Sequence, residues 1–129
     1  MTNDRENGVT ELVRRLRERH GDARPSAIAA ELKIPIRYES LRVAEDRVIY
    51  FGECWFDPPR IVLNSRAIAR EAARSGDAET EIAETVIAHE LYHVLTRQPS
   101  SRTVERRAHE FAVALWGKRR LNSTSWAIF

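Results

Sequence analysis

The chain has 129 residues, of which 43% are hydrophobic and 31% charged, and this length and composition are typical of one globular domain with a single core. Its net charge of only +2 argues against a nucleic-acid-binding surface, and no stretch approaches the roughly 18 apolar residues that span a membrane. The polar N-terminus lacks the apolar segment of a secretion signal, so we expect a cytoplasmic protein without direct nucleic-acid binding.

The first half of the chain predicts two helices followed by a small sheet. We expect residues 1–8 to be a disordered tail and residues 9–129 to form a single domain. Apolar residues at helical spacing predict a first helix from Thr10 to about His20 and a second from about Pro25 to Lys33. Alternating apolar residues and turn signals predict three strands, at Ile34–Glu39, Val48–Phe56 and Arg60–Leu63, with a turn at Asp57-Pro58-Pro59.

The middle predicted strand contains two informative residues. Gly52 inside a strand indicates a bulge or a place where another segment comes close to the backbone, as a bound peptide would. Cys54 is the only cysteine, so no internal disulfide can form, which fits a reducing compartment. The neighbouring aromatic residues favour a buried, unreactive thiol over a reactive or zinc-bound one.

After a predicted helix at about Ser65–Ser75, a second helix carries His89-Glu90-Leu91-Tyr92-His93, an HExxH motif. Two His four residues apart project from one helical face, where both rings can reach a single metal ion. Glu90 is turned about 100° from His89 around the axis, so it can take a proton from an attacking water without binding the metal. The alternative is a helix that carries two His by chance. The apolar residues around the motif predict a buried helix, however, and a buried His needs a partner such as a metal.

A catalytic zinc site needs a third protein ligand, and the next predicted helix offers two candidates. The connection at Pro99–Ser101 is short enough for the two helices to pack antiparallel. We expect Glu105 to be the third ligand, with His109, one turn further on, behind the site as the partner of a ligand His. In a second interpretation His109 is the ligand and Glu105 orients it. In a third, Glu105 belongs to an ordinary solvated, charged face.

The HELYH sequence, followed by E-x-x-A-x-x-F-A at Glu105–Ala112, resembles the ImmA/IrrE-type metallopeptidases, which are small gluzincins of bacteria and their mobile elements. The resemblance covers about residues 25–117. It implies a zincin-like domain that holds one zinc ion per chain, with Glu105 as the third ligand. Two positions depart from the family pattern, because Tyr92 replaces a usually small residue and His109 replaces a usual Asn.

We therefore expect an α+β fold in which a small antiparallel or mixed sheet packs on the HExxH helix and the following helix closes the metal site. The expected function is zinc-dependent hydrolysis of a protein substrate, which the resemblance suggests is a helix-turn-helix repressor. Glu90 would pass the proton from water to the leaving amine, and the strand at Val48–Phe56 would hold the substrate as an added strand. Tyr92 is a candidate oxyanion or substrate contact.

Two other functions compete with this one. A non-catalytic binding module, such as an antirepressor or a toxin–antitoxin component, would keep zinc only for stability, although such a site has no need of Glu90. A SprT-like protease would need a third His, which only His109 could supply. The oligomeric state is left open, and the apolar segment Trp126–Phe129 is expected to pack on the domain or on a neighbouring molecule.

Overall fold

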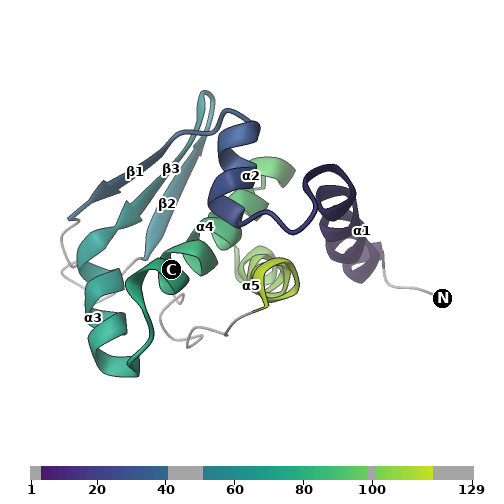
Figure 1. Ribbon diagram of the computed structural model, residues 1–129. Helices are drawn as coiled ribbons and strands as arrows, with labels where there is room; N and C mark the ends of the chain where they lie inside the picture. The colour runs from purple at the N-terminus through teal and green to yellow at the C-terminus, as the bar shows by residue number, and fades with distance from the viewer. Residues whose placement is uncertain (1–3, 41–50, 99–100, 118–129) are drawn as a thin grey trace.

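The computed structural model describes residues 4–40, 51–98 and 101–117. Within these ranges the protein is a mixed α+β structure with five helices and one three-stranded sheet (Figure 1). The helices are α1 (Asp4–His20), α2 (Pro25–Glu31), α3 (Ser65–Ser75), α4 (Glu79–Thr96) and α5 (Arg102–Trp116). The strands are β1 (Ile36–Glu39), β2 (Gly52–Phe56) and β3 (Pro59–Asn64). Among the described helices, none combines the length and apolar character that a membrane crossing requires.

The predicted order of elements is confirmed, but the bounds of some elements differ. The first helix begins at Asp4, earlier than the predicted start at Thr10. The second helix ends at Glu31, because the backbone turns at Lys33, which has a left-handed φ of 60°. Residues 1–3 of the expected tail, residues 48–50 of the expected middle strand, and Trp126–Phe129 lie outside the described residues.

The sheet is mixed, which was one of the two expected arrangements. Its strand order is β1-β3-β2, with β1 parallel and β2 antiparallel to β3. In this register Gly52 lies opposite Leu63 and Cys54 lies opposite Ile61. Because side chains alternate along a strand, these four residues share one face of the sheet. Ile61 and Leu63 are completely buried, so this face belongs to the hydrophobic core.

Helix α4 is the centre of the structure. It contacts α2, α3, α5, β2 and β3, and in Figure 1 it lies between the sheet and α5. Every residue from Ile82 to Val94 is buried, as the apolar pattern around the HExxH motif predicts. The two His and the Glu of the motif are therefore held inside the protein, where polar groups need partners.

Candidate metal centre

The two His of the motif lie on one face of α4. His89 is completely buried and His93 is 4% exposed, and their ring centroids are 5.3 Å apart. This proximity is what a spacing of four residues in a helix predicts. Both side chains direct their Nε2 atoms toward the start of α5.

Glu105 lies opposite the two imidazoles, in the first turn of α5. Ser101 caps the N-terminus of this helix, and its side chain accepts a hydrogen bond from the backbone N–H of Val104. Glu105 Oε1 is 3.0 Å from His89 Nε2, and Glu105 Oε2 is 2.5 Å from His93 Nε2. One donor atom from each residue lies within 4.8 Å of the others, so this buried group can hold a metal ion.

The tautomer of His93 favours metal binding. Its Nδ1 lies 3.1 Å from the backbone carbonyl oxygen of Gln98, to which only a protonated ring nitrogen can donate. A neutral ring with its proton on Nδ1 keeps the lone pair of Nε2 for a metal. A hydrogen bond from the second ring nitrogen to a carbonyl is the usual way in which proteins orient a metal-binding His.

The charges of the group also suit a cation. Burial by itself would raise the pKa of Glu105, but its hydrogen bonds to His89 and His93 lower that pKa to about 2. Burial opposes protonation of His93, yet Glu105 and Glu90 raise its pKa above the ordinary value. A carboxylate therefore remains ionised beside two imidazoles, and two His with one Glu is a donor set used by catalytic zinc sites.

Glu90 follows His89 and faces the sheet. It is only 6% exposed, and burial raises its pKa, with His89 and His93 acting in the opposite direction. A Cβ atom on Gly52 would lie 3.4 Å from Glu90 Cγ and 2.9 Å from Val86 Cγ1. The close approach that Gly52 predicts is therefore confirmed, but the neighbouring segment is α4 of the same chain.

Cys54 lies on the same face of β2 as Gly52 and within hydrogen-bond reach of Glu90. The thiol is half-buried, and burial, followed by the charge of Glu90, raises its pKa. A raised pKa disfavours the reactive thiolate, in line with the predicted unreactive thiol. The sequence contained a signal for this contact that was missed, because residues two apart in a strand share a face and Gly52 already indicated a close neighbour.

His109 and Tyr92 have other surroundings. His109 is buried on α5, but it is not part of the group of donor atoms formed by His89, His93 and Glu105. The ring of Tyr92 packs against Phe111 of α5, with centroids 5.4 Å apart, and it is 4% exposed. The large residue at this position thus fills the α4–α5 contact, and its role as an oxyanion donor remains a prediction.

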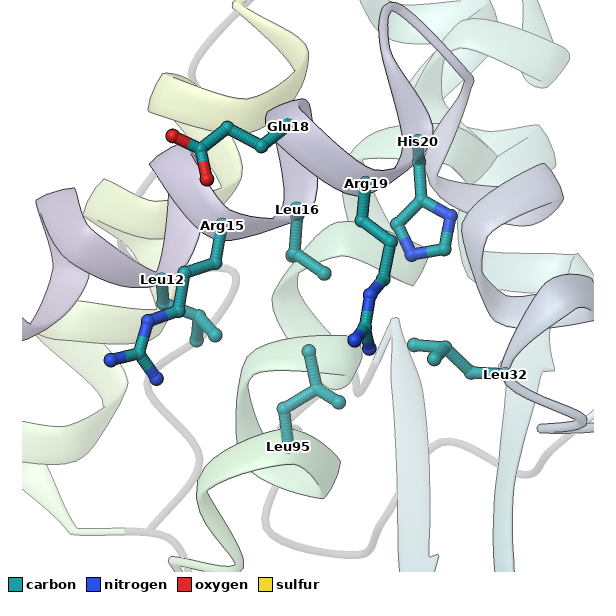
Figure 2. Close-up of a pocket in the computed structure, with 8 residues that line it drawn as sticks. All are labelled: Leu12, Arg15, Leu16, Glu18, Arg19, His20, Leu32 and Leu95. Atoms are coloured by element: carbon teal, nitrogen blue, oxygen red, sulfur yellow. The ribbon is translucent and has the colours of Figure 1, made fainter.

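A hollow of about 520 Å³ lies elsewhere, between α1, α2 and the end of α4 (Figure 2). Its apolar side chains are Leu12, Leu16, Leu32 and Leu95, and Arg15, Glu18, Arg19 and His20 also line it. None of the three candidate metal ligands lines this hollow. It is therefore separate from the candidate metal centre.

No known protein family, characterised protein or solved structure matches this chain. The resemblance to the ImmA/IrrE-type metallopeptidases consequently remains a prediction. The geometry of the site itself is therefore the basis for assigning a function.

Proposed function

We propose that this protein is a zinc-dependent endopeptidase with a zincin-like fold, of the gluzincin type. The observation that carries the proposal is the convergence of His89, His93 and Glu105 on one point, with Glu90 buried beside them. Three protein ligands leave a position open for water or substrate, as catalytic zinc sites require. A purely structural zinc site would be closed by a fourth protein ligand, and no such group joins the three among the described residues.

The identity of the third ligand favours the gluzincin type over the SprT-like one. Glu105 contacts both imidazoles, whereas His109 is not in the group. When bound, a zinc ion would polarise the scissile carbonyl and make the attacking water more acidic. The expected content is one zinc ion per chain.

Glu90 is the general base in this proposal. Its carboxylate is adjacent to the metal ligands but is not one of them, so its oxygens stay available for a proton. Because burial raises its pKa, it is a better base than an exposed glutamate and can hold the proton until the amine leaves. The His89 and His93 side chains, in contrast, would only hold the zinc ion in place.

The substrate would be a protein segment in extended conformation. β2 is at one edge of the described sheet and packs across α4 beside Glu90. An extended peptide that added to the outer edge of β2 would pass the metal centre and use main-chain hydrogen bonds for affinity. The resemblance suggests a helix-turn-helix repressor as the natural substrate, and a nucleic acid or a membrane is not part of the proposal.

The test separates chemistry from binding by changing Glu90 to Gln. Glu90→Gln keeps the size of the side chain and removes its basicity, so zinc content and folding should be retained. Cleavage should fall by about 10²–10⁴-fold, the usual contribution of a general base. The matched control is Glu110→Gln, which makes the same chemical change at an exposed position of α5.

The substrates for this assay are unfolded casein and the protein encoded by the neighbouring gene, with new termini identified by mass spectrometry. Cleavage by wild type and Glu110→Gln, but not by Glu90→Gln, would support the proposal. A zinc-loaded wild-type protein that cleaves neither substrate, yet binds the neighbouring protein equally well with Glu90→Gln, would favour the non-catalytic binding module instead.

A further inference from the structure

Glu90 has an unusual environment for a carboxylate. It is 6% exposed, and the thiol of Cys54 lies within hydrogen-bond reach of its carboxylate. An ionised carboxylate removed from water is costly unless donors satisfy it. A donor beside this buried carboxylate therefore stabilises its ionised form, and the Cys54 thiol is placed to act as one.

The strand geometry places the thiol at this point. β2 can approach α4 closely because Gly52 has no side chain, and a Cβ there would lie 3.4 Å from Glu90 Cγ. Cys54 is two residues further along and points from the same face of the strand. The Glu90 side chain thus runs beside β2 from Gly52 toward Cys54.

We propose that Cys54 is a positioning residue, whose thiol donates a hydrogen bond to the Glu90 carboxylate and holds it in the orientation needed for proton transfer. As a statement about catalysis this rests on the proposed peptidase function, whereas the contact itself does not. The thiol touches neither substrate nor metal in this role. Its effect acts entirely through Glu90.

A merely structural role makes a different prediction. If Cys54 only filled space under the sheet, an apolar side chain of similar size at this position should preserve kcat. If Cys54 donates a hydrogen bond, serine should preserve kcat and apolar residues should not. The comparison of Cys54→Ser with Cys54→Ala and Cys54→Val therefore separates donation from packing.

The contact can be measured without zinc and without any activity. Cys54 is the only cysteine in the chain, so a single S–H stretching band in the Raman spectrum reports this one thiol. In the metal-free wild type the band should lie below that of a free thiol. Glu90→Ala should raise it toward the free value, and Glu90→Gln, whose amide oxygen is a weaker acceptor, should raise it less.

The matched control for the spectrum is Glu53→Ala. Glu53 is the exposed neighbour of Cys54 on the opposite face of β2, and its charge also acts on the thiol. Its removal should leave the band in place. A band that does not move in either Glu90 variant, or that moves equally in Glu53→Ala, would overturn the contact.

The kinetic arm tests the positioning role. Cys54→Ala and Cys54→Val should lower kcat about tenfold or more, the effect expected from losing one hydrogen bond to a charged group, with KM and zinc content unchanged. Cys54→Ser should retain most of the wild-type kcat. Full kcat in the alanine and valine variants would overturn the role. A wild type that cleaves nothing would instead refute the peptidase function, and the spectrum would still decide the contact.

Discussion

The substitution Gly52→Ala tests the packing that brings β2 to the metal helix. The new Cβ would lie 2.9 Å from Val86 Cγ1 and 3.2 Å from the backbone oxygen of Val62. Both distances are shorter than ordinary contacts between these atoms. The oxygen belongs to the paired strand β3, so it cannot move without disturbing the sheet, and the strand must instead shift away from α4.

The expected cost is that of inserting one methyl group into a packed core, about 1–3 kcal/mol in the free energy of unfolding. For a chain of this length each kcal/mol corresponds to about 3–5 °C in Tm, so the expected fall is roughly 3–15 °C. Thermal and urea unfolding, followed by circular dichroism, would measure it. A shift of β2 would also displace Glu90, so kcat should fall even at temperatures where the variant is still fully folded.

Two controls test whether β2 presses on α4. Gly8→Ala makes the same change in α1, where a Cβ meets nothing within 4 Å, and should stabilise the protein by about 0.5–1 kcal/mol. Val86→Ala removes the atom that clashes, so the double variant Gly52→Ala/Val86→Ala should be more stable than the sum of the single effects predicts. Strict additivity, or a Gly52→Ala protein as stable as wild type, would show that β2 does not press on α4.

The remaining predictions concern the metal centre. Purified protein should contain about one zinc ion per chain. Glu105→Ala should weaken zinc binding far more than His109→Ala, for which we expect zinc affinity to fall by about 10–100-fold. Competition with a chromogenic chelator would measure both affinities. The reverse ranking would make His109 the ligand and revive the SprT-like alternative. In zinc-free protein, Glu105 has a pKa of about 2 against an ordinary value of 4.5, because its bonds to His89 and His93 outweigh burial, so its contribution to stability should be lost as the pH falls from about 4.5 toward 2. The pKa of His93 is raised above 6.5 although burial opposes this, so the contribution of His93 to stability should be lost as the pH rises above about 6.5. In a plot of the free energy of unfolding against pH, Glu105→Gln should reduce the dependence in both ranges.

The parts of the site that a helix dictates locally could be predicted from the sequence. The spacing of His89 and His93 fixes them on one face, and the apolar residues around them predict burial of α4. Both expectations agree with the structure. The mixed α+β class could likewise be predicted, because each element carries its own periodicity.

The choice between Glu105 and His109 could not be decided in this way. The two residues lie one turn apart on the same side of α5, so helical periodicity does not distinguish them. Which one meets the imidazoles depends on how far α5 is displaced along α4. This displacement is a property of the packing between α4 and α5, which is not expressed as a pattern within one helix.

The contact between Cys54 and Glu90 illustrates the same limit across a longer separation in sequence. It requires the register of β2 on β3, the packing of that sheet face on α4, and the absence of a side chain at Gly52. Each condition is simple, but they act together only in the folded protein. Because Glu90 lies beside Cys54 and Gly52 of β2, a small change in β2 should alter the base more than the metal ligands, which are held by α4 and α5. We therefore expect Gly52→Ala, Cys54→Ala and Cys54→Val to retain zinc while their kcat falls.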